Sequence, residues 1–192
     1  MPISAIVFGG RRAKVAPLVY ESHSWQHGVF IGSSMASETT AAAAGAVGVV
    51  RRDPMAMLPF CGYNMGDYFA HWLHMGKKLT NPPKIFNINW FRQDEAGRFV
   101  WPGFGENIRV LQWILDRCED KADAKETPIG YVPTEINTEG LNLPEDALHR
   151  LLSVDTDAWR EEAAGIEQFY KQFDRLPQEL REELEALKER LG

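Results

Sequence analysis

Five aromatic residues crowd into one turn-rich stretch between residues 89 and 107. They are Trp90, Phe91, Phe99, Trp101 and Phe104, and Gly97, Pro102, Gly103 and Gly105 lie between them. Aromatic side chains normally lie on strands or helices, where a core can cover them. This stretch is therefore either a satellite hydrophobic cluster that holds a long loop, or a surface on which a flat ring can stack. Composition alone favours the satellite cluster.

Asn107 closes this stretch, just before a segment with helical spacing. Its side chain offers both a donor and an acceptor, as recognition of a base edge requires. The start of a helix is also a typical place for an asparagine that caps free backbone amides. On the residues alone, both interpretations of Asn107 stay open.

The overall composition limits the classes of protein that the chain can represent. Its 192 residues, 44% hydrophobic and 25% charged, suit one globular domain or two small ones. The formal net charge of −6 disfavours nucleic acid or an anionic membrane as a partner. Cys61 and Cys118 form no CxxC pair, so we expect a reducing compartment and no structural zinc. No apolar run could span a bilayer and no signal-like segment opens the sequence, so we expect a cytoplasmic protein.

Hydrophobic spacing predicts strands and helices along the first two thirds of the chain. We predict strands at residues 3 to 8, 29 to 31 and 84 to 90, and a further strand that begins at residues 49 and 50 and is broken at Asp53-Pro54. Helices are predicted at residues 62 to 79 and 106 to 118. After Thr127 the character changes, because residues 128 to 143 contain two prolines and suggest an extended linker. Helices are then predicted at 144 to 152, 155 to 173 and 176 to 191. This gives two parts, residues 1 to 127 and 128 to 192.

The dipeptide Arg11-Arg12 follows two glycines at the end of the first predicted strand. Glycines let a backbone approach a ligand closely, and arginine recognises phosphate oxygens with a planar fork of donors. The plainer interpretation is a hairpin turn with two solvated arginines, and it is favoured on this motif alone. For Arg51-Arg52 we favour a solvated strand end or a salt-bridge role.

Residues 35 to 48 are almost free of bulky side chains. Ordering such a segment buries little apolar area and costs little side-chain entropy, so its ordered and disordered states can lie close in free energy. A lid over a binding site needs two states of similar free energy, because contacts with the ligand must determine whether the lid is ordered. The alternative is an alanine-rich helix capped at Gly45, and the two are not exclusive.

The histidines form no recognisable metal-ligand set. His71 and His74 are three residues apart and His23 and His27 are four apart, so either pair would need a further ligand. The sequence shows neither a Ser-His-Asp signature nor a Walker A motif. We therefore expect structural or surface histidines, and no metal site in this chain.

Six blocks of sequence, taken in order, resemble one enzyme family. They are ISAIVFGGRR, WQHGVFIGSSMASETTAAAAG, RRDPMAMLPFCGYNMGDYFAHWL, PKIFNINWF, FVWPGFGENIRVL and TPIGYVP. From Pro2 to the last helix, the chain resembles the C-terminal part of GTP-dependent phosphoenolpyruvate carboxykinases of bacterial type. The resemblance implies an α/β fold: the C-terminal portion of the carboxykinase mixed-sheet nucleotide-binding domain, with a helical tail.

The resemblance also implies roles for individual residues. Phe91, Phe99 and Phe104 match phenylalanines that enclose the guanine ring, Trp90 matches a neighbouring tryptophan, and Asn107 matches the contact to the base edge. Arg11 matches an arginine that holds the transferred phosphate. A mobile lid is matched by Ser37, Glu38, Thr39, Thr40, Ala41, Ala42, Ala43, Ala44, Gly45, Ala46, Val47 and Gly48. With this resemblance, the guanine pocket replaces the satellite cluster as the favoured interpretation of the aromatic stretch.

Members of this family convert oxaloacetate and GTP to phosphoenolpyruvate, GDP and CO2 in gluconeogenesis, with Mn²⁺ or Mg²⁺. The resemblance thus implies a guanine nucleotide as ligand, with oxaloacetate or phosphoenolpyruvate as partners of the whole enzyme. The family's P-loop lysine, metal ligands, substrate-binding arginines and reactive cysteine lie upstream of the matched region. We therefore expect a fragment with exposed sheet edges and apolar surface that is inactive alone. The alternative is a non-catalytic module that binds a guanine nucleotide or pairs with a missing N-terminal half.

Overall fold

The computed structural model describes residues 2 to 40 and 47 to 192. Its main element is a mixed five-stranded sheet, in the order β1-β5-β2-β7-β6. Strand β1 is parallel to β5, and each of the other neighbouring pairs is antiparallel. The strands are β1 (Ala5–Gly9), β2 (Val19–Glu21), β5 (Lys84–Ile88), β6 (Ala124–Thr127) and β7 (Gly130–Pro133).

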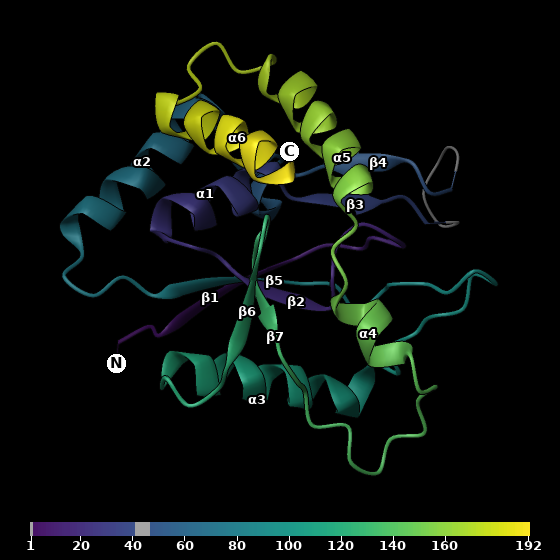
Figure 1. Cartoon of the computed structure of the whole chain (residues 1–192). Coiled ribbons are helices and arrows are strands. Elements are labelled where there is room, and N and C mark those ends of the chain that lie inside the picture. The colour runs from purple at the N-terminus through teal and green to yellow at the C-terminus, as the bar shows by residue number, and fades with distance from the viewer. Residues whose placement is uncertain (1, 41–46) are drawn as a thin grey trace.

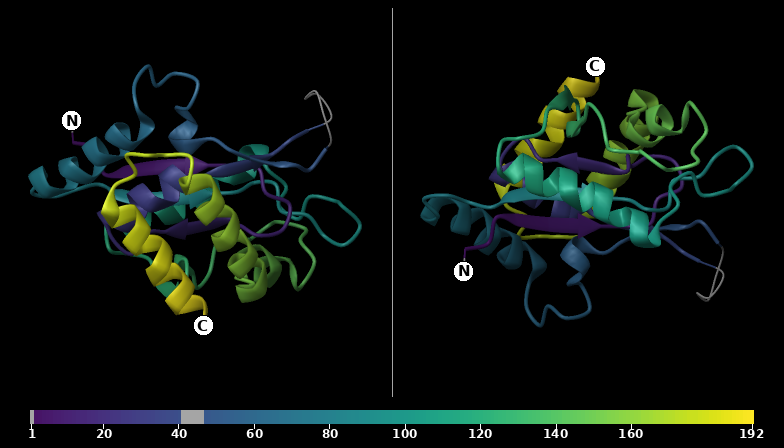
Figure 2. Two further views of the ribbon diagram at one scale, coloured as in Figure 1. Left: turned by 90° about the horizontal axis from the view of Figure 1, so that it is seen from above. Right: turned by 90° about the horizontal axis from the view of Figure 1, so that it is seen from below.

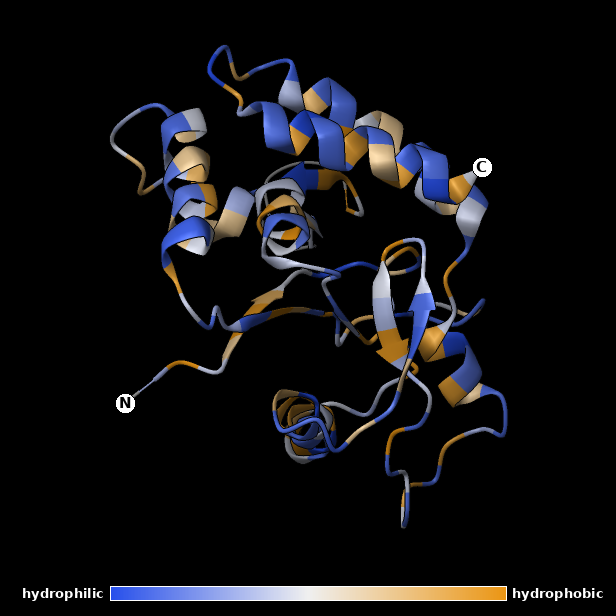
Figure 3. Cartoon of the chain, turned by 60° about the vertical axis from the view of Figure 1, so that its left-hand side comes forward, coloured by the Kyte–Doolittle hydropathy of each residue, from blue (hydrophilic) through white to orange (hydrophobic). Residues whose placement is uncertain are grey.

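Helices cover both faces of this sheet (Figures 1 and 2). One face carries α1 (Trp25–Ser34), α2 (Met65–Lys78), α5 (Thr156–Tyr170) and α6 (Gln178–Leu191), and the other carries α3 (Asn107–Cys118) and α4 (Ala147–Leu152). Each face has its own hydrophobic cluster, the larger one under the four helices. The two C-terminal helices intersperse hydrophobic and hydrophilic residues (Figure 3), as expected of helices with one buried side. The expected α/β architecture is therefore confirmed.

The amphipathic helices were predicted well, because each buries one regular stripe. In α3, Val110, Trp113 and Ile114 are buried as expected. In α5 the buried stripe contains Trp159 and Ile166. The strand predicted at residues 84 to 90 ends earlier, at Ile88.

The strand predicted at residues 29 to 31 was wrong, because these residues lie in helix α1. Ser24 caps this helix by accepting a hydrogen bond from the His27 N–H. The helix is so buried that its sequence shows no amphipathic period, and its Val and Ile favour a strand on propensity alone. Gly28 lets it lie against β5, since a Cβ there would be 2.4 Å from the Ile85 side chain. Tertiary packing overrides the local preference here.

The extended linker predicted from residue 128 was also partly wrong. Strands β6 and β7 form a hairpin across that position, and β7 joins the main sheet where Tyr131 pairs with Glu21 of β2. Gly130 has φ of +134°, and a Cβ on it would lie 2.3 Å from the Glu21 carbonyl oxygen. Only glycine can make this close approach without strain.

A second, two-stranded sheet lies beside the main one. Strand β3 (Ala36–Glu38) pairs antiparallel with β4 (Val50–Arg52), so that Ser37 is opposite Arg51. The predicted strand from 49 and 50 is thus present as β4, whereas β3 and β2 were not predicted. Their three residues each are too short for a periodic signal.

The expected exposed edge and apolar surface are both present. Strand β1 lies at one edge of the main sheet, and Val7 on it is exposed. Helix α3 also exposes Ile108, Leu111 and Leu115. Among the helices that the structure describes, none is long and apolar enough to cross a membrane.

We expect the buried His27 to make the fold sensitive to acid. Its side chain is buried, its Nδ1 accepts a hydrogen bond from the His23 N–H, and the two imidazoles stack at 4.8 Å. Burial first, and then the charges of His23 and Arg190, hold the pKa of His27 well below its ordinary value. The folded state therefore binds fewer protons than the unfolded state once the pH falls below about 6.5.

We expect the free energy of unfolding to fall by on the order of 1 kcal/mol between about pH 7.5 and 5.5. Urea denaturation at the two pH values measures this loss. His27→Asn, whose Oδ1 can still accept the His23 N–H, should remove most of the pH dependence. His71→Gln changes an exposed histidine on α2 and should leave it unchanged. An equal pH dependence in the His27 variant would contradict this assignment.

Candidate functional site

The carboxyl ends of β1 and β5 bring Arg11 and Phe91 together. Because these strands are parallel neighbours, the segments that follow them leave the same edge of the sheet. The Arg11 Cζ atom lies 3.7 Å from the centre of the Phe91 ring, which is a cation–π contact. A cavity of about 340 Å³ opens beside this pair, and its lining includes Gly10, Ser37 and Trp90.

The aromatic stretch divides into an anchored part and an exposed part. Trp101 is 2% exposed and belongs to the core cluster under α3. Phe91 and Phe99 meet edge to face, with ring centres 5.8 Å apart, and Phe99 is 54% exposed. Phe104 is 97% exposed, so the satellite-cluster interpretation explains Trp101 but fails for this ring.

Local backbone features hold the loop in this form. The Asp94 carboxylate accepts hydrogen bonds from the Ala96 and Arg98 N–H groups, and these bonds, with that from Arg98 foremost, lower the pKa of Asp94. Gly97 completes the turn with φ of +76°. Phe104 has φ of +49°, an unusual and costly value for a bulky residue. Strain of this kind, together with an exposed ring, is typical of a binding site.

Asn107 is the first residue of α3, and its side chain does not cap the helix. The N-cap position belongs to Glu106, which makes no side-chain capping bond. The Asn107 Oδ1 instead accepts a hydrogen bond from the Trp101 indole at 2.8 Å. The capping hypothesis was therefore wrong, and the anchored tryptophan fixes the orientation of this amide.

The sequence-predicted site residues do not all meet in this structure. Arg11, Ser37, Trp90 and Phe91 line one cavity, and Phe99 adjoins it through Phe91. Within the described part of the chain, no ring contact joins Phe104 to the other phenylalanines. Phe91 and Phe99 line different hollows, so the three rings do not form one closed slot in this structure.

The described N-terminal end of the predicted lid is hydrogen-bonded to the turn at residues 10 to 12, called the arginine turn below. The Ser37 Oγ accepts a hydrogen bond from the Arg11 N–H at 3.1 Å, and the Glu38 N–H donates to the Arg11 carbonyl at 2.8 Å. A Cβ on Gly10 would lie 2.3 Å from the Ala36 carbonyl oxygen, so glycine is needed there. Thr39 and Thr40, with Val47 and Gly48, are also described, whereas Ala41, Ala42, Ala43, Ala44, Gly45 and Ala46 lie outside the described residues.

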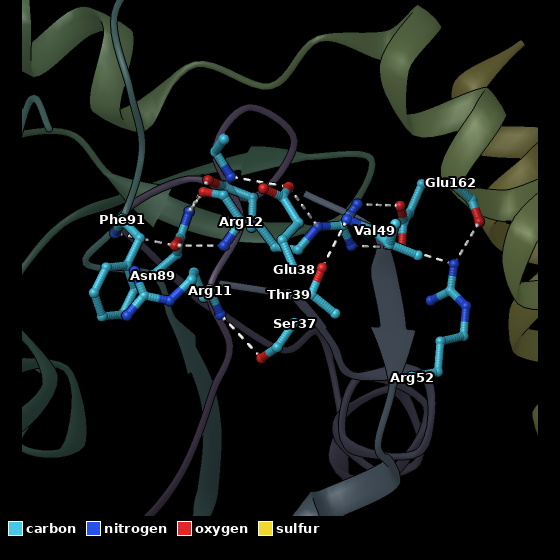
Figure 4. A network of polar contacts seen from close by, with 12 residues as sticks. Arg11, Arg12, Ser37, Glu38, Thr39, Val49, Arg52, Asn89, Phe91 and Glu162 are labelled. Carbon is cyan, nitrogen blue, oxygen red and sulfur yellow. Dashed lines mark hydrogen bonds and ion pairs between the residues drawn. The ribbon is translucent and has the colours of Figure 1, made fainter. Parts of the chain in front are cut away.

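A buried ionic network lies behind this turn (Figure 4). Glu162 of α5 accepts two hydrogen bonds from Arg12, at 2.8 and 2.5 Å, and pairs with Arg52 of β4 at 2.9 Å. Arg12 also lies 3.5 Å from the Glu38 carboxylate of β3. Burial alone raises the pKa of Glu162, but the hydrogen bonds and charges of Arg12 and Arg52 outweigh it and keep this pKa below its ordinary value.

This network corrects one sequence prediction and agrees with another. Arg12 is buried and paired, so the favoured hairpin turn with two solvated arginines was wrong for this residue. Arg51 and Arg52 both form salt bridges, as we favoured. The role of Glu162 was missed, although a signal existed: it adjoins Ala163 on the buried stripe of α5, where an unpaired carboxylate would be costly.

The described residues do not fit a metal site. No group of three or more His, Cys, Asp or Glu side chains in the part of the chain described could hold a metal ion. We therefore assign no chemical step in this chain to a metal.

Comparison with known proteins gives one consistent result. A family model described as the phosphoenolpyruvate carboxykinase C-terminal P-loop domain matches residues 1–190. The chain is similar over its whole length to proteins named "Phosphoenolpyruvate carboxykinase [GTP]". It is 50% identical to the one from Thermoplasma volcanium, 55% to that from Renibacterium salmoninarum and 53% to that from Chlamydia muridarum, covering 33%, 32% and 33% of their lengths. The chain thus spans about a third of the length of these curated relatives.

Proposed function

The chain belongs to the GTP-dependent phosphoenolpyruvate carboxykinases, as part of their C-terminal P-loop domain, and we propose that it carries their guanine-nucleotide site. The observation that supports this most is the contact between Arg11 and Phe91. In this contact a guanidinium, which can bind phosphate, lies against an aromatic ring that can stack on a base. In the complete protein, this site would serve conversion of oxaloacetate and GTP to phosphoenolpyruvate, GDP and CO2.

At the base end, three phenylalanine rings would bind the purine. Phe91, Phe99 and Phe104 can supply faces and edges for stacking, worth about 1–3 kcal/mol for each base contact. Trp90 would form the wall toward the cavity. Because Trp101 already holds the oxygen of Asn107, the donor end of this amide would meet the base edge. Guanine offers the acceptor O6 to such a donor and adenine offers an N–H group there.

At the phosphate end, Arg11 would bind the transferred group. Its guanidinium can hold two phosphate oxygens at once and can stabilise the charge that develops during transfer. Within the described residues Arg11 has no carboxylate partner, so its charge is available to a ligand. Mn²⁺ or Mg²⁺ would be held by other parts of the complete protein.

Next to Arg11, we propose the segment from Ser37 to Gly48 as a lid. Decarboxylation leaves an enolate that water would protonate, so a closing segment would protect it. Two hydrogen bonds support this role, one from the Arg11 N–H to the Ser37 Oγ and one from the Glu38 N–H to the Arg11 carbonyl, since they join the start of the segment to the turn that carries Arg11.

The base preference of this site can be measured directly. We expect calorimetric titration of the chain to give measurable heat with GDP, and at least about tenfold weaker binding of ADP, because one lost base-edge hydrogen bond that leaves a buried group unpaired costs about 1–3 kcal/mol. Circular dichroism on the same sample would show that the chain is folded. Equal affinities for GDP and ADP, or no heat from a folded chain, would refute the guanine site.

The chain covers only about a third of the length of its relatives, and this favours a second role. The chain would supply one part of a site whose other residues lie elsewhere in the complete protein. We expect the purified chain to show no turnover of oxaloacetate with GTP and Mn²⁺. Adding a polypeptide that carries the preceding two thirds of the family sequence should restore turnover if the chain is a half-enzyme module. Turnover by the chain alone would contradict the prediction. If the added polypeptide does not restore turnover, the remaining candidate is a non-catalytic module that binds a guanine nucleotide.

A further inference from the structure

Asn89 lies directly after β5, between the two halves of the proposed site. Its side chain is 1% exposed, and it makes four hydrogen bonds. The oxygen Oδ1 accepts from the Arg12 N–H at 3.1 Å and from the Phe91 N–H at 3.2 Å. The nitrogen Nδ2 donates to the carbonyls of Arg12 and Ala16, at 2.8 and 2.9 Å.

These partners determine the orientation of the amide. Two N–H groups approach one end of it and two carbonyl groups approach the other, so a flipped amide would face four mismatched groups. Every donor and acceptor that faces the side chain is thereby matched, as a buried polar group requires. Figure 4 shows Asn89 between the arginine turn and Phe91.

One side chain thus joins the backbone of the arginine turn to the backbone of the aromatic stretch. Arg12 and Phe91 are 79 positions apart in sequence numbering but share a single acceptor atom. Arg11 has no acidic partner within the described residues, and its guanidinium rests on the Phe91 ring. The spacing between the phosphate-binding group and the base-binding ring therefore depends on this shared acceptor.

We propose that Asn89 is a positioning residue that couples the base and phosphate ends of the nucleotide site. This inference rests on the proposed function, because it assigns the two ends to one ligand. A preorganised site lets a ligand with both groups gain from both contacts without a further cost of ordering. When the Asn89 hydrogen bonds are lost, the base end and the phosphate end can still bind their groups separately. A ligand that carries both groups then gains less affinity over a ligand that carries one.

The test compares GTP, which carries the transferred phosphate, with guanosine, which lacks all phosphates, on the 192-residue chain. In Asn89→Ala the ratio of the guanosine Kd to the GTP Kd should fall about tenfold. Loss of folded protein alone would weaken both ligands equally and leave this ratio unchanged. Asn64→Ala removes a capping amide at the start of α2 and should leave the ratio as in the unaltered chain. An unchanged ratio in Asn89→Ala would overturn the proposal.

A second measurement needs no variant and no nucleotide. Amide hydrogen exchange in the unaltered chain should show the Arg12 and Phe91 N–H groups protected to a similar degree, since one buried acceptor holds both. Exchange of the Phe91 amide at the rate of an open loop, with Arg12 still protected, would overturn the proposal even if Asn89→Ala does not fold. If the chain binds no nucleotide, the proposed function fails, and hydrogen exchange still decides whether Asn89 joins the two segments.

Discussion

Replacing Glu162 by alanine is expected to lower the free energy of unfolding by about 3–5 kcal/mol, the cost of removing one partner from a buried ion pair. The carboxylate is the shared partner of Arg12 and Arg52, and all three side chains are buried. Without it, two guanidinium groups from different segments would be left close together in the interior. Urea denaturation followed by circular dichroism measures the change.

Glu161→Ala is the matched control, because this exposed glutamate precedes Glu162 on the same helix. Its effect should stay within about 0.5 kcal/mol. A loss below about 1 kcal/mol for Glu162→Ala would mean that the network contributes little to stability.

The same carboxylate should shape the response to acid. Because the pKa of Glu162 is lowered in the fold, its stabilising contribution is complete above the unfolded value of about 4.3. That contribution is lost as the pH falls through the lower folded pKa, so Glu162→Gln should show a shallower loss of stability on acidification.

Replacing Phe104 by alanine should weaken GDP binding by about 5- to 150-fold, which corresponds to the 1–3 kcal/mol that stacking on one base contributes. The free energy of unfolding should change by less than about 0.5 kcal/mol, since the ring is 97% exposed. Calorimetric titration gives the affinity, and urea denaturation gives the stability.

Phe60→Ala provides the comparison, because Phe60 is also exposed, at 75%, but lies outside the aromatic stretch. It should leave GDP affinity unchanged. Equal affinities of Phe104→Ala and the unaltered chain would remove Phe104 from the base site.

The parts of the fold that sequence predicted are those with a regular period. Helices α2, α3, α5 and α6 each bury one stripe, so their spacing was sufficient. Helix α1 was missed because nearly all of it is buried and no period remains. The β6–β7 hairpin was missed because pairing with β2 gives it stability that its proline-flanked sequence does not display.

The residues of the candidate site also differ in how far the sequence pointed to them. Arg11, Phe91 and Phe104 became candidates through local motifs and through resemblance to a family, and their roles remain predictions. Asn89 and Glu162 were not found, because each has partners far away in the sequence: Asn89 is 77 residues and Glu162 is 150 residues from Arg12. Such pairs leave no short motif, and only the fold shows that they meet.

The most direct test of this function is a crystal structure of the chain with GTP. We expect a guanine ring against Phe91 and Phe104, its edge near the Asn107 amide, and oxygens of the terminal phosphate within hydrogen-bonding distance of the Arg11 guanidinium. A guanine ring bound elsewhere, or phosphates directed away from Arg11, would contradict it.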